Sequence, residues 1–136
     1  MTQIKWNEQF SVGIKEIDDQ HKTFIKMINK LVASEWSMSK KETVADVLNE
    51  MLQYASLHFE TEERYMRNNA YPEYEAHKQQ HEFFKKETFE LIAKVTEEKV
   101  DPINELYDFL STWLTGHIIG SDAKYAPYLS QDGSKP

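Results

Sequence analysis

The chain has no cysteine and only four glycines and four prolines among its 136 residues. The absence of cysteine excludes a disulfide scaffold, thiolate metal ligands and a cysteine nucleophile. So little glycine and proline argues against a collagen-like chain, a Pro/Gly-rich linker and a turn-dense β-sandwich. No stretch approaches the roughly 18 apolar residues of a membrane span, and the start, MTQIKWNEQF, has no apolar signal-peptide core. We therefore expect a cytoplasmic protein without membrane insertion.

What the chain does contain indicates one folded domain. Hydrophobic residues make up 40% of the sequence and aromatic residues 12%, which is enough to bury a real core in a single domain. Acidic residues outnumber basic ones by 23 to 16, and the resulting net charge of −7 would repel a phosphate backbone. We therefore expect no nucleic-acid partner.

Four segments show helical periodicity, at roughly 19–35, 39–68, 72–95 and 101–117. In each, apolar residues recur every three or four positions. The connections are short, so neighbouring helices must run antiparallel. The sequence thus predicts an all-α fold, an up-down-up-down four-helix bundle. The predicted start signals of the four helices are, in order, Asp18 or Asp19 as a cap, the capping box Ser39-Lys40-Lys41-Glu42, Pro72 in a first turn, and the cap and first-turn proline Asp101-Pro102. Asn68-Asn69 is the predicted end of the second helix.

Outside the bundle we predict two short segments within a single domain, 1–136. Residues 1–17 form an arm that is too apolar to stay in solvent and should pack on the bundle, residues 18–122. Residues 123–136 form a C-terminal tail that frays from Ser130 to Pro136. The apolar residues of the arm are Trp6, Phe10, Val12, Ile14 and Ile17.

All five histidines lie in register with the apolar rows of their helices. A single histidine in such a row is most often a hydrogen-bonded core residue. If the inner face covers about three positions in seven, all five fall on it by chance roughly once in seventy times. Five imidazoles in one core also exceed the obvious polar partners, and unpaired buried polar groups are costly. A metal site is therefore the favoured interpretation of His21, His58, His77, His81 and His117.

Glu62 is the first carboxylate that fits this set. It follows His58 by four residues, so both project from one helix face. A solvated face is the alternative, because Glu60 and Glu63 are nearby. Glu62, however, interrupts an apolar row, where a lone carboxylate would be expensive to bury.

Asp122 is the second carboxylate, and its spacing alone is a weak argument. It follows His117 by five residues, which separates the two side chains by about 140° on a regular α-helix. If both reach one centre, the backbone between Ile118 and Asp122 must be wider than an α-turn. A single-turn π-bulge is the usual solution, and Gly120 makes such a distortion easier.

These seven side chains are too many for one ion. His77 and His81, four residues apart, can bind the same metal. Imidazole and carboxylate without thiolate suit iron, zinc, copper or manganese. Two six-coordinate ions need about twelve bonds, and five imidazoles, two bridging carboxylates and one bridging oxygen supply about eleven. One position stays open for a small molecule such as dioxygen.

At this point the sequence resembles the bacterial hemerythrins over nearly its whole length. The motifs that carry the resemblance are Trp6…Phe10-Ser11-Val12-Gly13-Ile14…Ile17-Asp18…Gln20-His21-Lys22, His58-Phe59-x-x-Glu62-Glu63-x-x-Met66, Tyr71-Pro72-x-Tyr74-x-x-His77-x-x-x-His81 and Trp113-Leu114-x-x-His117-Ile118-x-x-x-Asp122. All seven ligand positions of that family are filled. One position departs from it: relatives commonly have a Lys after the bridging Asp, where this chain has Ala123 and then Lys124.

The resemblance implies a stand-alone, non-enzymatic protein that binds dioxygen reversibly at an oxo- or hydroxo-bridged centre of two iron ions. Its partners would be dioxygen and an oxygen-consuming enzyme as recipient, and the protein would be a monomer. By position, three histidines would hold one iron and two would hold the iron with the open position. The implied roles are His77, His81 and His117 for the first, His21 and His58 for the second, and Glu62 and Asp122 as bridges.

Three other functions remain open alongside an oxygen carrier or store. A di-iron oxidase or iron-oxidising enzyme typically uses four carboxylates with Glu-x-x-His pairs, and here no histidine has Glu three residues before it. An oxygen, nitric oxide or redox sensor would need an output that this chain does not obviously contain. A structural dizinc bundle is the third alternative, and metal analysis would separate it from the others.

Residues one turn from the ligands are expected to line the pocket of the bound oxygen. Water and protons promote autoxidation, in which bound dioxygen takes electrons from the iron and leaves as superoxide or peroxide. The pocket should therefore be dry. Leu114 and Ile118 flank His117 and are small enough to act as a gate. The alternative is that all the lining residues are ordinary core. The expected lining is Phe24, Phe59, Trp113, Leu114 and Ile118.

Overall fold

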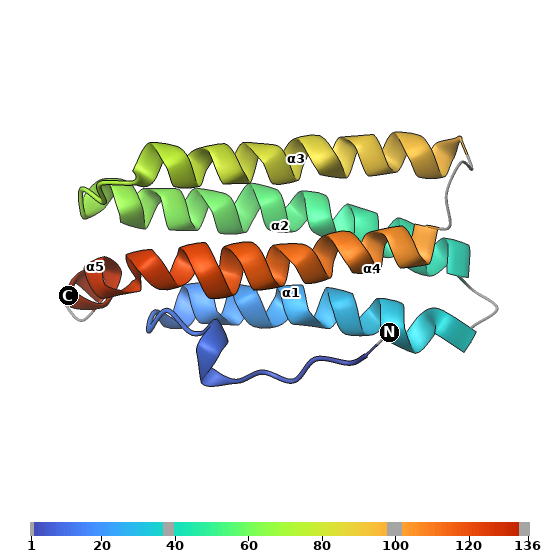
Figure 1. Cartoon of the computed structure of the whole chain (residues 1–136), viewed down its shortest axis with the longest axis horizontal. Helices are drawn as coiled ribbons and strands as arrows, with labels where there is room; N and C mark the ends of the chain where they lie inside the picture. The colour runs from blue at the N-terminus through green and yellow to red at the C-terminus, as the bar shows by residue number, and fades with distance from the viewer. Residues whose placement is uncertain (1, 37–39, 98–101, 134–136) are drawn as a thin grey trace.

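The computed structural model describes residues 2–36, 40–97 and 102–133, and within these ranges it is helical without any strand. Four long helices lie side by side (Figure 1), with α1 packed on α2 and α4, and α2 packed on α3. This confirms the predicted all-α four-helix bundle. The bounds are Lys15–Ala33 for α1, Lys40–Asn68 for α2, Tyr74–Thr96 for α3 and Pro102–Trp113 for α4.

Helical structure continues past residue 122, where the prediction placed the end of the bundle. A π-helical segment, Leu114–Asp122, follows α4 directly and leads into α5, Ala123–Gly133. The predicted widening before Asp122 is thus confirmed, although it spans nine residues rather than a single turn. Gly120 is not sterically required, because a Cβ there would meet only the carbonyl oxygen of Thr115 at 3.7 Å.

The prediction of a C-terminal tail from residue 123 was wrong over the described part, 123–133. These residues are helical, and Tyr125 in α5 is fully buried. The ring of Tyr125 packs with Tyr71 and Met66 in a second apolar cluster, so the burial of one aromatic side chain holds this segment on the bundle. Residues 134–136 lie outside the described residues.

The predicted arm does pack on the bundle, and it ends earlier than expected. Phe10, Val12 and Ile14 are buried, but residues 15–17 already belong to α1. The helix begins at Lys15 rather than near Asp19 because the Asp18 carboxylate is not a helix cap. It accepts hydrogen bonds from the Val12 N–H, at 2.8 Å, and from the Ser11 hydroxyl, at 2.6 Å. Asp18 thus ties the arm to the first turn of α1.

Two other end signals also act differently from the prediction. After α2 the left-handed residue is Ala70, with φ 52°, rather than Asn68 or Asn69. Pro72 lies in the turn before α3 rather than in its first helical turn. Pro102 does begin α4, as predicted. Ser39 and Asp101 lie outside the described residues.

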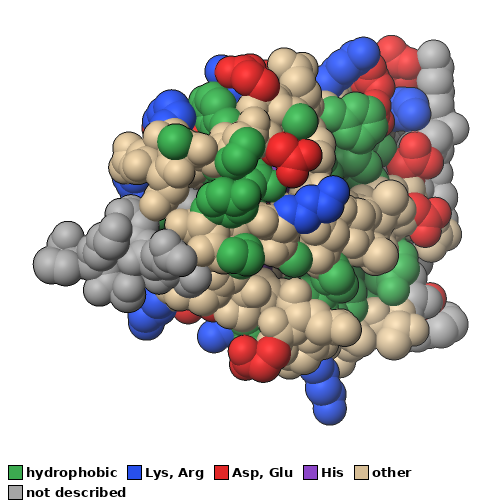
Figure 2. All heavy atoms as spheres, turned by 60° about the vertical axis from the view of Figure 1, so that its left-hand side comes forward, with side chains coloured by type: hydrophobic (Ala, Val, Ile, Leu, Met, Phe, Trp, Pro, Cys, Tyr) green, Lys and Arg blue, Asp and Glu red, His purple; other side chains and the backbone are tan. Residues whose placement is uncertain are grey.

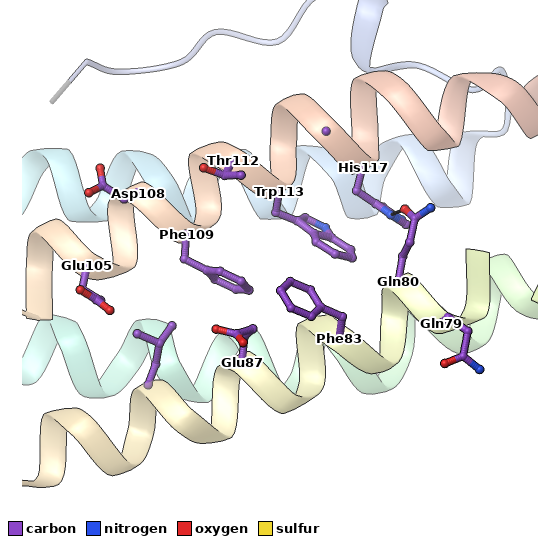
Figure 3. Close-up of a pocket in the computed structure, with 12 residues that line it drawn as sticks. Gln79, Gln80, Phe83, Glu87, Glu105, Asp108, Phe109, Thr112, Trp113 and His117 are labelled. Atoms are coloured by element: carbon purple, nitrogen blue, oxygen red, sulfur yellow. Dashed lines mark hydrogen bonds between the residues drawn. The ribbon is translucent and has the colours of Figure 1, made fainter. Parts of the chain in front are cut away.

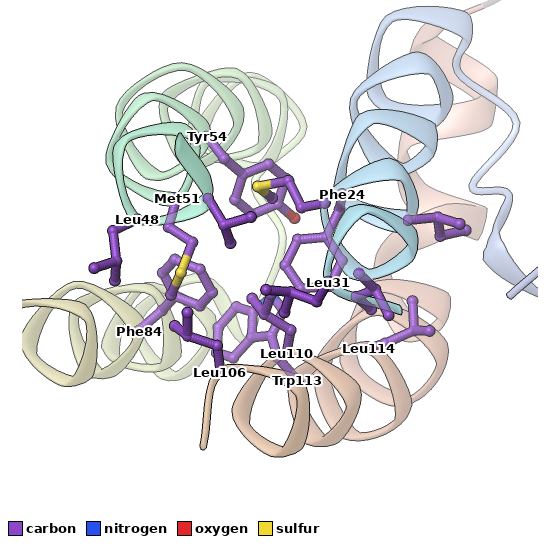
Figure 4. Packing of buried hydrophobic residues seen from close by; sticks show 14 of the residues in the cluster. Phe24, Leu31, Leu48, Met51, Tyr54, Phe84, Leu106, Leu110, Trp113 and Leu114 are labelled. Carbon is purple, nitrogen blue, oxygen red and sulfur yellow. The ribbon is translucent and has the colours of Figure 1, made fainter. Parts of the chain in front are cut away.

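The core is divided into two apolar clusters with a polar layer between them along α2. Phe59 belongs to the larger cluster and Met66 to the smaller, and the buried Glu62 lies between them in the sequence. Figure 4 shows the larger cluster, where aromatic and aliphatic side chains from all four long helices meet. Such packing fixes the helices on both sides of the polar layer.

Few large hydrophobic side chains are exposed among the described residues. The exposed large hydrophobic side chains are dispersed over three helices, and Figure 2 shows hydrophobic, acidic and basic groups interspersed on one face. In the part of the chain that the structure describes, no helix is both long and apolar enough to cross a membrane. The exposed hydrophobic residues are Leu57, Phe83, Phe89 and Tyr128.

Candidate metal centre

The seven side chains predicted from the sequence converge in the polar layer of the bundle. They come from α1, α2, α3 and the π-helical segment, and each is at most 3% exposed. In all five histidines the ring atom Nε2 is the one that approaches an oxygen of Glu62 or Asp122. The structure thus brings together His21, His58, Glu62, His77, His81, His117 and Asp122.

Their donor atoms form two groups that share Glu62. In one, the donor atoms of Glu62, His77, His81 and His117 all lie within 4.8 Å of one another. His81 Nε2 is 3.1 Å from Glu62 Oε1, the shortest approach to this carboxylate in the group.

The second group joins His21, His58, Glu62 and Asp122 under the same distance limit. Asp122 also reaches the first group, since its Oδ1 lies 2.9 Å from His77 Nε2 and its Oδ2 lies 3.0 Å from His21 Nε2. Two carboxylates between two sets of imidazoles form a site for two ions.

The π-helical segment is what places His117 and Asp122 in the same centre. In a π-helix the backbone bonds run from i to i+5, so residues five apart lie one turn apart. The structure accordingly places His117 Nε2 3.1 Å from Asp122 Oδ1. The spacing of five that looked weak in the sequence is therefore the correct spacing for this backbone.

Four of the histidines have their outer nitrogen held by an oxygen atom. The Nδ1–H of His21 donates to the carbonyl of Phe10 at 2.7 Å, so the arm orients one ring. The other three partners are side chains, at 2.6–2.8 Å: Gln20 for His58, Glu63 for His81 and Gln80 for His117. A proton on Nδ1 leaves the lone pair of neutral Nε2 facing inward, as metal ligation requires.

Aromatic rings stack on three of the imidazoles. Phe59 lies parallel to His81, with centroids 3.9 Å apart and 6° between planes. Trp113 stacks on His117 at 4.0 Å, and Tyr54 stacks on His58 at 4.6 Å. These rings restrict imidazole rotation and keep water from the inner faces.

Two grooves reach the outer sides of these stacked rings. One, of about 700 Å³, opens between α3 and α4 and is lined by Trp113, His117 and Gln80 (Figure 3). The other, of about 390 Å³, lies between α1 and α2 and is lined by Tyr54 and His58. The centre is therefore buried by only one layer of side chains on each of these two sides.

The two carboxylates hold protons on the metal-free cluster. Burial lowers the pKa of His21, but hydrogen bonds to Asp122 and Glu62 outweigh burial and raise the pKa to about 10. Burial also lowers the pKa of His77, but the close carboxylates of Asp122 and Glu62 outweigh burial and raise this pKa to about 10. In His58 burial dominates and the pKa is lowered. A metal ion entering the centre must therefore displace protons.

Unpaired buried atoms show that the residues fit a metal. The Nε2 atoms of His58, His77 and His117 and Oδ1 of Asp122 lie 2.9–3.3 Å from a polar atom of the cluster, but none is aligned for a regular hydrogen bond in the described structure. Buried polar atoms are seldom left without a partner, and four at one place are an arrangement that fits a bound cation. Five imidazoles and two carboxylates without thiolate are donors that suit iron.

Sequence reasoning missed the residues that support these ligands. Tyr125 donates a hydrogen bond to Oε2 of Glu62 from the segment that was predicted to be a tail. Glu63, at 7% exposed, is buried and bonded to His81, although its presence was used as an argument for a solvated face. The one available signal was the repeated Gln-His pair, since Gln20 and Gln80 each precede a histidine and each hold a different one.

The five predicted pocket residues are all buried in the larger apolar cluster. Their exposed fractions do not exceed 7%. The structure thus places Phe24, Phe59, Trp113, Leu114 and Ile118 together. Whether they hold a ligand stays a prediction at this point.

Comparison with known proteins gives one consistent result. The family model described as "Hemerythrin HHE cation binding domain" matches residues 12–129. A bacteriohemerythrin of Clostridium acetobutylicum is 32% identical over 88% of this chain and 96% of its own length. One of Stenotrophomonas maltophilia is 36% identical over 93% of this chain and 81% of its own. A crystal structure of wild-type hemerythrin superposes with a TM-score of 0.83 at 28% identity, covering 95% of this chain and 99% of that one.

Proposed function

The chain belongs to the hemerythrin family, and from this membership we propose that its di-iron, oxygen-binding domain binds dioxygen reversibly, as a carrier or store. The observation that carries the proposal is the buried cluster of five imidazoles and only two carboxylates, with four inward-facing atoms unpaired. An oxygen-consuming enzyme of the cytoplasm would be the recipient.

Each side chain has a role in this proposal. His77, His81 and His117 would hold one iron and His21 and His58 the other, with Glu62 and Asp122 shared between the two. This division follows the two groups of donor atoms, in which Glu62 is common and Asp122 approaches histidines of both. When bound, two iron ions supply the electrons and the open position that dioxygen binding needs.

The protein's own contribution is to favour binding over oxidation. Two carboxylates place less negative charge at the centre than the four of typical oxidase sites, which disfavours high-valent iron. The outer hydrogen bonds hold each Nε2 in place, and the stacked rings of Tyr54, Phe59 and Trp113 keep water away. Excluding water and protons would favour the release of dioxygen without its reduction.

The test is the response of iron-loaded protein to oxygen. Protein loaded anaerobically with ferrous iron should hold two irons per chain. It should gain a visible absorption band on exposure to dioxygen and lose it under argon through several cycles. An irreversible change after one exposure would contradict reversible binding, and zinc in place of iron after reconstitution would contradict the di-iron assignment.

A pair of variants separates the centre from the surface. Asp122→Asn removes a buried bridging charge and should leave less than two irons per chain. Asp19→Asn removes a half-exposed carboxylate of the same bundle, paired only with Lys15, and should load fully. Equal iron content in the two variants would contradict the role of Asp122.

A further inference from the structure

The seam between α3 and α4 is the open side of the bundle. Backbone packing is close between α1 and α2, between α2 and α3, and between α1 and α4, whereas α3 and α4 approach each other much less. The groove of about 700 Å³ that reaches His117 lies in this seam and is called the α3–α4 groove below. In a four-helix bundle each helix packs on two neighbours. Along this groove α3 and α4 therefore each keep one face without a helical partner.

The floor of the α3–α4 groove is aromatic, and part of it is open to solvent. Figure 3 shows the rings of Phe83, Phe109 and Trp113 lying toward one another across the groove. Phe83 is 54% exposed although it lies beside these rings. At Gly116, on the same floor, a Cβ atom would meet nothing within 4 Å, so the space there is empty. Covering such a surface with an apolar partner is favourable.

The length of the groove fits a helix. Its α3 side runs from Gln79 to Leu91, which is about three turns or about 18 Å. A groove between two helices accepts the side-chain ridges of a third helix, and amphipathic helices bind to other proteins in this way. An occupant that covers the whole floor is therefore a helix of about three turns with one apolar face.

The groove is acidic toward the end distant from His117. Figure 3 shows its three carboxylates on that side: Glu87, Glu105 and Asp108. Of these, only Glu105 has an ion pair with a described residue, Lys94, at 3.5 Å. The described residues that line the groove include no lysine or arginine, and the whole chain has a net charge of −7. Electrostatics therefore favour a partner with basic side chains.

A second copy of this chain is a poor occupant of the groove. In a dimer of two-fold symmetry each groove would face the same groove of the other copy. That surface has carboxylates but no described basic side chain to pair with them. Glu87 and Asp108 would then be covered without a cation, and burying an unpaired charge is costly.

We propose that the α3–α4 groove is a docking site for a basic amphipathic helix of a partner protein, which covers Phe83 with apolar side chains and faces Glu87 and Asp108 with lysine or arginine. The other end of the groove is lined by Gln80 and His117, so the docked helix lies one layer of side chains from the metal centre. Dioxygen binding plays no part in the argument, so the docking site goes beyond the proposed function and does not depend on it.

The experiment uses the iron-loaded protein and a fluorescently labelled model peptide. The peptide has about 12 residues, three helical turns, with leucine on one face and lysine on the other. Binding is followed by fluorescence anisotropy. We expect saturable binding that weakens as salt is added, and no binding of the same peptide with glutamate in place of lysine. Absence of binding by the lysine peptide, or equal binding of both peptides, would overturn the proposal.

Two phenylalanines of α3 supply a matched pair of variants. Phe83 and Phe89 are 54% and 62% exposed, and only Phe83 lines the groove. We expect Phe83→Ala to weaken peptide binding about fivefold or more, and Phe89→Ala to leave it unchanged. Circular dichroism and iron content should match wild type in both variants, because both rings are largely exposed. Equal losses of affinity in the two variants would mean non-specific adhesion and would overturn the proposal.

Two glutamates of the same helix test the charge separately. Glu87→Gln and Glu90→Gln each remove one negative charge, but only Glu87 lines the groove. Glu87→Gln should weaken binding about twofold to fivefold, whereas Glu90→Gln should not. Equal effects would show attraction by net charge alone and would contradict a site in the groove. Light scattering without peptide should give a monomer; association that Phe83→Ala abolishes would identify a second copy as the occupant and overturn the assignment to a basic partner.

Discussion

The contact between Tyr125 and Glu62 can be tested by removing one oxygen atom. Tyr125 is fully buried, and its hydroxyl donates to Oε2 of Glu62, the carboxylate common to both halves of the centre. Burial and the charges of Glu62 and Asp122 raise the pKa of Tyr125 well above its usual value, so the phenol remains a donor. Tyr125→Phe keeps the ring and leaves Glu62 without this bond.

The size of the effect follows from the charge and burial of the pair. A hydrogen bond to a charged group contributes about 1.5–3 kcal/mol, and Glu62 is fully buried. The free energy of unfolding of the metal-free protein should fall by that amount. For a chain of 136 residues this corresponds to a decrease in Tm of about 5–10 °C. Because Glu62 is then less firmly oriented, iron affinity should fall about 10-fold to 100-fold.

The assay compares Tyr125→Phe with Tyr71→Phe. Tyr71 is buried in the same small cluster, with its ring 6.0 Å from that of Tyr125, but its hydroxyl faces Glu73 at 3.4 Å, on the surface. Metal-free Tm is measured by circular dichroism, and iron retention by competition with a chelator. If both variants lose the same stability and retain iron equally, the reasoning from the Glu62 contact is refuted.

Three further predictions concern the pocket, the protons and the outer hydrogen bonds. Leu114→Ala should lower the free energy of unfolding by about 2–5 kcal/mol, since Leu114 is buried. Both Leu114→Ala and Ile118→Ala should also speed autoxidation of the oxygenated form at full iron content. Wild-type autoxidation rates in both variants would refute the role of these two residues as a gate. His21 and His77 have a pKa of about 10 in the metal-free protein, because the carboxylates of Asp122 and Glu62 outweigh burial. Metal binding at pH 7 should therefore release protons and strengthen as the pH rises. Calorimetry in buffers of different ionisation heat should detect this release, and buffer-independent heats would contradict it. Gln80→Ala should lower iron affinity about 10-fold or more by freeing His117, whereas Gln79→Ala, at an exposed neighbouring position, should not, as a chelator titration would show.

The fold was predictable because its signals are local. Apolar residues every three or four positions define each helix, and short connections leave only antiparallel neighbours. End signals were less reliable: Asp18 resembles a helix cap in sequence, but in the folded chain its carboxylate serves Ser11 and Val12. Helix termini depend on which backbone groups the tertiary structure leaves unpaired, and the local sequence does not contain that information.

The set of seven polar residues in the centre was predictable for a related reason. A histidine or glutamate in an apolar row must be buried when the helix packs, so its register already places it inside the bundle. Even the π-helical widening follows from the spacing between His117 and Asp122, once both are required at one centre. The roles of these residues toward each iron rest on family resemblance and on the grouping of their donor atoms.

By itself, then, the sequence determined which side chains enter the core and from which helix each one comes. Only the tertiary structure decided what holds them: Gln20 with His58, Gln80 with His117, and Tyr125 with Glu62 are separated by 38, 37 and 63 residues along the chain. Helical periodicity sets the direction of a side chain from its own axis, whereas a hydrogen bond across the bundle depends on how far and at what rotation the neighbouring helix lies. That distance and rotation are set by the packing of the whole core.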